Sequence, residues 1–480
     1  MAEHFGDDSW SYKEISQTFL KKYEGWTPPQ VSTDEGKIEP LTHGYDGPVK
    51  ISIENWDFDP GQCVTKAAAE DGFAGFEFNK DMNAGNMLGL GWAQLNHGHG
   101  RRSTAATGYI HAPRIDKNLK FDVLLETSVT KLGLTANTDG THSVSRVEIA
   151  QSEDAPTYML YPKKDVILSA GSINSPLIMM LSGIGDPAVL AEQGLHTIVE
   201  LPEVGKNLVD HVTYPALFKV ETNNTFDEFF RSPSLTEDYM ERWRKYNTGP
   251  MASGAMPALS FHRLPKDDPI WEKFEDPSPG GNSPHWEVMW TDGYFNGPGQ
   301  PHFPTGNYMG AGITLISPVA RGNISLSSTS PFQVPVVHGE LLNNEWDMHT
   351  LRSALREVRN FLYNAPSMKP LNPTPFADQF GAETDEEVDA YIRKMIFSIW
   401  HPSCTTAVGP VLDSRFVVKG VNNLRVVDAG SMPIIADGHP VGSLYGMAEK
   451  AADIIKTDHS KAKTAAQDGK NQARLRDTEL

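Results

Sequence analysis

A short β-rich segment that ends at a glycine and leads into a capped apolar helix constrains the fold most. Residues 165–171 (DVILSAG) have the composition of a strand followed by a turn. Asn174 or Ser175 can accept hydrogen bonds from the exposed amides of a helix start, and Pro176 suits the first helical position. The apolar run 177–181 continues that helix. A strand, a glycine turn and a capped helix form half of a mononucleotide-binding fold, so we expect an α/β domain.

The middle of the chain, from about 215 to 395, has a different pattern. Loops rich in Gly, Pro and Asn, such as 277–284 and 296–301, separate strand-like runs at 285–290 and 312–317. One amphipathic helix is predicted from apolar residues at steps of three and four: Met348, Leu351, Leu355, Val358 and Leu362. We therefore expect an α+β domain built on an antiparallel sheet.

The α/β pattern returns near the end of the chain, with a strand at 423–429 and a buried helix at 441–456. The middle segment is thus inserted into the first domain. The expected division is 1–214 and 396–456 for the two parts of the α/β domain, 215–395 for the inserted domain, and 457–480 for a disordered tail poor in large apolar residues.

Charge and hydropathy exclude some partners. The formal net charge of −19 argues against a nucleic-acid partner, because a polyanion requires a basic surface. No run of eighteen apolar residues predicts a membrane span, and the N-terminus does not resemble a signal peptide. The two cysteines do not form a disulfide framework. A cytoplasmic location is favoured, and secretion stays open if the natural N-terminus is not included.

A fifteen-residue stretch, 171–185 (GSINSPLIMMLSGIG), resembles the second signature of the glucose–methanol–choline (GMC) oxidoreductases over its full length. Residues 204–211 (VGKNLVDH) are similar to the family's VGxNLxDH block and follow at the expected distance. Other similar segments lie at 10–24, 100–109, 118–119, Val129, 317–322, 401–402, 428–433 and 438–440. The resemblance runs from about residue 10 to 456 and implies a flavoprotein that binds FAD and oxidises a small-molecule alcohol.

One part of the family pattern is absent from this sequence. GMC proteins open with a strand, a G-x-G-x-x-G turn and a helix that binds the FAD pyrophosphate. Such a βαβ unit takes roughly 30 residues, and there is no room for it before Trp10. We therefore expect an FAD-binding domain that is incomplete at its N-terminus. The exposed sheet edges would favour self-association or a separate N-terminal chain.

Two histidines are the candidate catalytic residues. Oxidation of an alcohol needs a group that is neutral near pH 7 and accepts the hydroxyl proton, which suits histidine. Any one of the 16 histidines taken at random is structural far more often than catalytic. The family resemblance selects His401 as the base and His439 as a second hydrogen-bonding partner of the alcohol oxygen.

The same resemblance implies which residues contact the flavin: Val129, Asp428, Ala429, His439, Pro440 and Val441. The helix that begins near Pro440 would direct its positive end at the flavin, although a core helix has the same pattern. Val129 would contact adenine, or would be an ordinary strand residue. No metal is expected, because the pair His97 and His99 lacks a third ligand at a recognisable spacing.

Two hypotheses follow from these patterns. In the first, the chain belongs to an FAD-dependent alcohol oxidase or dehydrogenase. In the second, it is a flavin-free degenerate homologue that catalyses acid–base chemistry such as cyclisation or dehydration, or serves as a scaffold. The missing pyrophosphate loop favours the second hypothesis. Both histidines and the flavin-facing segment from Asp428 to Val441 favour the first.

Overall fold

The computed structural model describes residues 1–111, 121–294, 305–376 and 384–478, with side chains in the last helix up to Lys461. The predicted family segment at 118–119 and the loop at 296–301 lie outside the described residues.

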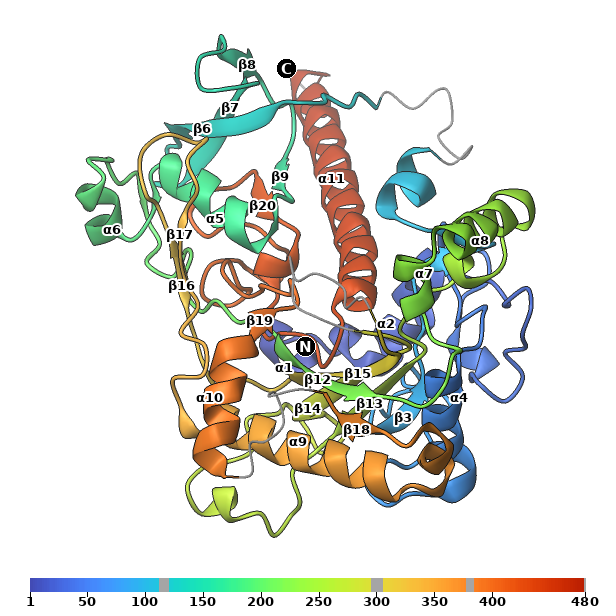
Figure 1. The fold of residues 1–480 in the computed structure, drawn as a ribbon. Coiled ribbons are helices and arrows are strands. Elements are labelled where there is room, and N and C mark those ends of the chain that lie inside the picture. The colour runs from blue at the N-terminus through green and yellow to red at the C-terminus, as the bar shows by residue number, and fades with distance from the viewer. Residues whose placement is uncertain (112–120, 295–304, 377–383, 479–480) are drawn as a thin grey trace.

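A large antiparallel sheet forms one end of the molecule (Figure 1). Its strands run in the order β18-β12-β15-β14-β13-β3, and β19 also pairs with β12. Their bounds are β3 Gly89–Trp92, β12 Val212–Lys219, β13 Ala258–His262, β14 Trp286–Thr291, β15 Tyr308–Leu315, β18 Thr374–Pro375 and β19 Phe397–Ser398. The expected antiparallel sheet is therefore confirmed, and it also takes β3 and β19 from outside 215–395.

The helix α9 (Glu345–Asn364) covers one face of this sheet (Figure 1). All five residues of its predicted apolar stripe are buried, which confirms the amphipathic helix. Strands β14 and β15 are buried at every position. Both faces of the central strands are thus covered, and their side chains contribute to one of two extensive cores.

The other end of the molecule holds the α/β elements (Figure 1). Strand β9 (Val166–Leu168) pairs in parallel with β20 (Leu424–Val426), although 258 positions separate Val166 from Leu424. An antiparallel meander of β6 (Ser128–Ala136), β7 (His142–Ala150) and β8 (Tyr158–Leu160) lies at the far end. The strands predicted at 165–171 and 423–429 are therefore confirmed in their central residues.

The helix after β9 begins earlier than the sequence predicted. Helix α5 spans Gly171–Leu181, so Pro176 lies inside it and not at its first position. The start is fixed from elsewhere in the chain, because Asp428 Oδ2 accepts a hydrogen bond from Gly171 N at 2.9 Å. Pro176 cannot donate to the Ser172 carbonyl. That carbonyl accepts instead from Thr405 Oγ1 at 2.6 Å, so the missing backbone bond is replaced.

Helix α11 spans Val441–Thr478, which is longer than the predicted 441–456. It begins beside the antiparallel sheet and runs towards the meander (Figure 1). Where the sequence predicted a disordered tail from 457, the structure continues the helix. Lys, Ala and Gln are strong helix formers, so this composition suits a solvated helix as well as a tail. Within the described residues, no helix is long and apolar enough to cross a bilayer.

Shorter elements complete the two ends. The helices are α1 Ala2–Phe5, α2 Tyr12–Ile15, α3 Lys21–Tyr23, α4 Asp59–Lys66, α6 Pro187–Glu192, α7 Asp227–Arg231, α8 Pro233–Tyr246 and α10 Asp385–Met395. The strands are β1 Glu24–Trp26, β2 Val49–Ile51, β4 His97–Gly98, β5 Arg101–Arg102, β10 Ile184–Gly185, β11 Val199–Glu200, β16 Asn323–Ser325 and β17 Val336–His338.

Candidate active site

His401 and His439 meet at the junction of the two ends of the molecule. His401 follows strand β19 of the antiparallel sheet, and His439 lies two residues before helix α11. Their ring centroids are 5.1 Å apart and the ring planes are almost perpendicular, at 87°. The chain therefore brings the two predicted catalytic residues together from positions 38 residues apart.

The backbone around His401 is held by Asp210. Asp210 Oδ1 accepts from the amide of His401 at 3.0 Å, and Oδ2 accepts from Ser398 Oγ at 2.5 Å. Trp400, between them, has a φ of 62°, a left-handed conformation that is unusual for a residue with a side chain. Because such a conformation is costly, its presence beside His401 indicates a turn that the surrounding contacts impose.

The His401 ring contacts a second imidazole and no carboxylate among the described residues. Its Nδ1 lies 3.1 Å from Nδ1 of His211, which is completely buried. Burial is the main cause that lowers the pKa of His401 to about 2, and electrostatic interactions with the His211 and His439 rings act in the same direction. The ring is therefore neutral throughout the physiological pH range, and one of its nitrogens keeps a lone pair.

The His439 ring has the opposite surroundings. Its Nε2 lies 2.9 Å from Oε1 of Glu287, a carboxylate on β14 that is fully buried. Burial lowers the pKa of His439, but the Glu287 carboxylate outweighs burial and raises it above the ordinary value. The second oxygen of Glu287 has no hydrogen-bond partner among the described residues. Glu287 thus favours a protonated His439 next to a neutral His401.

A cavity of about 790 Å³ opens beside His439. Gly438, Val441, Gly442 and Ser443 line it, so the first turn of α11 faces the space. Pockets for cofactors and ligands have volumes of roughly 300–1,000 Å³. The amides of a helix start favour negative charge. A Cβ on Gly438 would lie 2.9 Å from Cε of the flexible Met87 side chain, so Met87 packs closely against this wall. Size and lining both fit the ring system of a flavin.

The other residues predicted to contact FAD lie in two further places. Asp428 is half-buried and contacts the start of α5, accepting from Gly171 N and from Ser175 Oγ, the latter at 2.6 Å. Ala429 follows it, and its carbonyl accepts from the amide of Cys404 at 3.1 Å. Val129 lines a separate cavity of about 360 Å³. Pro440 is buried directly before α11.

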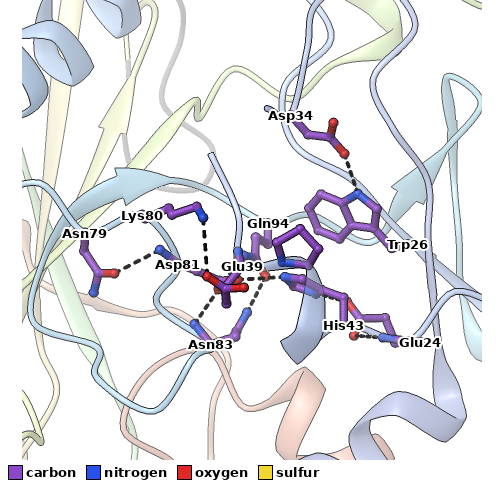
Figure 2. Close-up of polar contacts among 12 residues, drawn as sticks. Glu24, Trp26, Asp34, Glu39, His43, Asn79, Lys80, Asp81, Asn83 and Gln94 are labelled. Carbon is purple, nitrogen blue, oxygen red and sulfur yellow. Dashed lines mark hydrogen bonds and ion pairs between the residues drawn. The ribbon is translucent and has the colours of Figure 1, made fainter. Parts of the chain in front are cut away.

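A third histidine lies on another wall of the large cavity, with carboxylates on both sides of its ring (Figure 2). Glu24 Oε1 lies 2.7 Å from Nδ1 of His43, and Asp81 Oδ2 lies 2.9 Å from Nε2. Burial lowers the pKa of His43, but the hydrogen bonds to Asp81 and Glu24 outweigh it and raise the pKa to about 9. A buried ion cluster with a charged imidazole therefore supports this wall.

Sequence reasoning did not assign roles to His211, Glu287, His43 or its two carboxylates. His211 closes the VGKNLVDH block, and the block was used only as a family marker. Glu287 had a usable signal, because a lone carboxylate inside an otherwise apolar strand is costly unless it has a partner. No sequence spacing links Glu24, His43 and Asp81.

The fold and these contacts define a class of protein. Parallel α/β elements, a large antiparallel sheet and paired histidines beside a cofactor-sized cavity are typical of an oxidoreductase that holds a large organic cofactor. Comparison with known proteins narrows this class. The N-terminal and C-terminal profiles of the GMC oxidoreductases match residues 2–213 and 318–448.

Known relatives cover nearly the whole chain. Pyranose dehydrogenase 3 from Leucoagaricus meleagris is 32% identical, over 96% of this chain and 76% of the relative. Dehydrogenase eriK from Hericium erinaceus is 30% identical, over 96% of this chain and 77% of the relative. A formate oxidase variant from Aspergillus oryzae RIB40 shares the fold, with a TM-score of 0.84 at 24% identity, covering 96% of this chain and 80% of that one.

The chain belongs to the GMC oxidoreductase family. It is accordingly an FAD-dependent enzyme that oxidises an alcohol-type donor, as the sequence resemblance predicted.

Proposed function

We propose that the alcohol is oxidised between His401 and His439, with His401 as the base and His439 as the group that stabilises the alcohol oxygen. The observation that carries this proposal is the opposite charge preference of the two adjacent rings. The half-buried His401 ring contacts no carboxylate in the described residues, whereas Glu287 lies 2.9 Å from the His439 ring. A neutral ring beside a protonated ring provides one proton acceptor and one donor.

His401 accepts the hydroxyl proton of the substrate. Its low pKa reflects burial and neighbouring positive charge in the absence of substrate. When the alcohol O–H bond breaks, negative charge grows on the oxygen next to His401, and this charge favours the protonated ring. His439 donates a hydrogen bond to the same oxygen, and Glu287 keeps it protonated for that purpose.

Bound FAD would supply the acceptor for the hydride that leaves the carbinol carbon. The amides of Val441, Gly442 and Ser443 at the start of α11 would face the flavin. The N-terminus of a helix stabilises negative charge, such as the charge of a reduced flavin. Val129 would support the adenine half in the smaller cavity. Asp428 and Ala429 would hold the flavin-facing segment against α5, as their contacts with Gly171 and Cys404 support.

The proposed division into domains is 1–214 with 396–456 for FAD and 215–395 for the substrate. Among the named strands of the described part of the chain, the parallel pairs are β1–β2, β10–β11 and β9–β20, each a two-stranded sheet. These open edges support completion of the FAD domain by a further βαβ unit, by a separate chain or by self-association. Light scattering of the purified chain tests this proposal, since a clean monomer that retains FAD would contradict it.

The alcohol is proposed to be a small molecule that reaches the sheet-facing side of the two histidines. Relatives named pyranose dehydrogenase make pyranoses the first substrates to test, and a choline dehydrogenase from Mus musculus adds choline. A screen with oxygen and with an artificial electron acceptor separates an oxidase from a dehydrogenase.

One experiment tests the proposal directly. The chain is incubated with FAD, excess FAD is removed, and the flavin absorbance between 300 and 550 nm is recorded before and after addition of each alcohol. Bleaching of the bound flavin by an alcohol, lost in His401→Ala, supports the proposed roles. Flavin that is retained but bleached equally in both proteins excludes His401 as the base. A protein that never retains flavin favours a non-redox role for this chain.

A further inference from the structure

His211 lies directly before β12 of the antiparallel sheet and contacts the His401 ring. Its ring is completely buried. Nδ1 lies 3.1 Å from Nδ1 of His401, and Nε2 lies 3.1 Å from the carbonyl oxygen of Ile316. Each ring nitrogen of His211 therefore has one partner. The Ile316 carbonyl can only accept a hydrogen bond, whereas the His401 ring nitrogen can donate or accept one.

The Ile316 carbonyl fixes which nitrogen of His211 carries the proton. A carbonyl oxygen only accepts hydrogen bonds, so the contact requires a proton on Nε2 of His211. Burial and, to a smaller extent, the positive charge of His439 lower the pKa of His211 to about 3, so the ring is neutral and carries one proton. Nδ1 of His211 is then an acceptor with a lone pair.

The contact with His211 also fixes the position of the proton on His401. Two lone pairs facing each other at 3.1 Å would repel, so the contact between the two Nδ1 atoms needs one proton. Because the proton of His211 lies on Nε2, its Nδ1 has none to donate. The proton between the two Nδ1 atoms is therefore bonded to Nδ1 of His401. Nε2 of His401 is left with the lone pair, which is the state that a base requires.

We propose that His211 is a positioning residue that holds His401 in the tautomer protonated at Nδ1, so that Nε2 of His401 is free to accept the proton of the alcohol. This inference rests on the proposed role of His401 as the base. When the alcohol O–H bond breaks, the new N–H bond forms at Nε2 of His401. His401 is then a cation whose Nδ1–H bond still points at the lone pair of His211.

The surrounding backbone holds the three groups in register. Val212 and Leu315 are paired across β12 and β15, so His211 and Ile316 flank one rung of the sheet. The amide of Ile399 donates to the carbonyl of His211 at 3.1 Å, which ties the turn that carries His401 to the same strand. The hydrogen-bonded contacts that join Ile316, His211 and His401 are therefore held by the pairing of sheet strands.

Three substitutions separate an orienting role from simple packing. His211→Asn places an amide oxygen near the position of Nδ1, where it can accept from His401. His211→Gln is the matched control, because its longer amide lies near the position of Nε2 and reaches Ile316 instead. His211→Leu removes both contacts. Thermal unfolding of all three variants shows which of them are folded, and the Asn and Gln pair alone suffices if Leu fails to fold.

The first readout is the ¹⁵N NMR spectrum of histidine-labelled protein, recorded without and with FAD, with His401→Ala used to assign the signal. In the parent protein we expect a pyridine-type signal for Nε2 of His401 and a protonated Nδ1. We expect the same pattern in His211→Asn, and a mixed or reversed pattern in His211→Gln. A protonated Nε2 in the parent protein overturns the inference, as does an identical pattern in Asn and Gln.

The second readout is steady-state turnover of the FAD-loaded enzyme. Without an acceptor at the position of Nδ1 of His211, His401 can adopt the tautomer protonated at Nε2, which cannot accept the alcohol proton. We therefore expect kcat to fall by about tenfold or more in His211→Gln, with a smaller change in KM. His211→Asn should recover most of that loss. Equal kcat values in the two variants overturn the inference. If instead His401→Ala keeps full activity, the proposed base is wrong while the NMR test of the tautomer still stands.

Discussion

The molecule contains two buried histidine regions that differ in one respect, the charge of their neighbours. His43 lies between Glu24 and Asp81, with both ring nitrogens within 2.9 Å of a carboxylate oxygen (Figure 2). His401 lies against another imidazole, His211. The pKa of His43 is raised to about 9, whereas that of His401 is lowered to about 2. One residue type thus gives a cation at neutral pH in one region and a neutral base in the other.

Burial alone therefore does not decide the charge of an imidazole. Burial lowers the pKa in both regions. Carboxylate hydrogen bonds reverse its effect at His43, and further imidazoles reinforce it at His401. His439 is intermediate, because it has one carboxylate neighbour, Glu287. We interpret the His43 region as structural and the His401 region as chemical.

The largest effect is expected at the neutral ring. His401→Ala should lower kcat/KM by roughly 10²- to 10⁴-fold, the usual contribution of a general base. The measurement is steady-state oxidation of the best alcohol by FAD-loaded protein. His338→Ala is the control, because His338 is exposed on β17. A loss of less than about fivefold with unchanged stability would contradict the assignment of the base.

The second largest effect is expected on stability, when the charged ring of His43 is removed. His43→Leu leaves Glu24 and Asp81 buried without their cation, which should lower the free energy of unfolding by about 3–5 kcal/mol. Urea denaturation measures this loss. Lys80→Ala removes only the exposed pair with Glu39 and should cost less than about 1 kcal/mol. Similar losses in both variants would show that the His43 cluster is not a stabilising ion cluster.

The charge of His43 should also make stability depend on pH. A pKa that rises from 6.5 to about 9 on folding gives stability that is complete below pH 6.5 and is lost as the pH rises through about 9. The shift corresponds to roughly 3 kcal/mol. Urea denaturation of the parent protein at several pH values should show this decline, and His43→Leu should not. A parallel decline in both proteins would assign the effect to other groups.

The smallest effect is expected on the pH dependence of activity, when the carboxylate beside His439 is neutralised. Glu287→Gln removes the charge that raises the pKa of His439, so His439 should lose its proton at a lower pH. The alkaline limb of the kcat/KM profile should move to lower pH, with a loss of about tenfold at neutral pH. Glu35→Gln, at an exposed carboxylate, is the control. No acid limb from His401 is expected near pH 5, because its pKa is about 2.

Much of the fold was accessible from sequence because it follows from local patterns. The strand before Gly171, the amphipathic helix of Met348 to Leu362 and the start of α11 at Val441 each depend on residues within one or two turns. The start of α5 was misplaced because its first amide bonds to Asp428, a residue 257 positions away. Local capping chemistry could not contain that information.

The sequence by itself determined the family and the identity of the candidate pair, because the signature at 171–185 and the positions of His401 and His439 are linear features. Tertiary structure decided the charge of each ring. Glu287 reaches His439 across 152 positions and His211 reaches His401 across 190. A pKa depends on what surrounds a group within a few ångströms, and chain folding alone sets those neighbours.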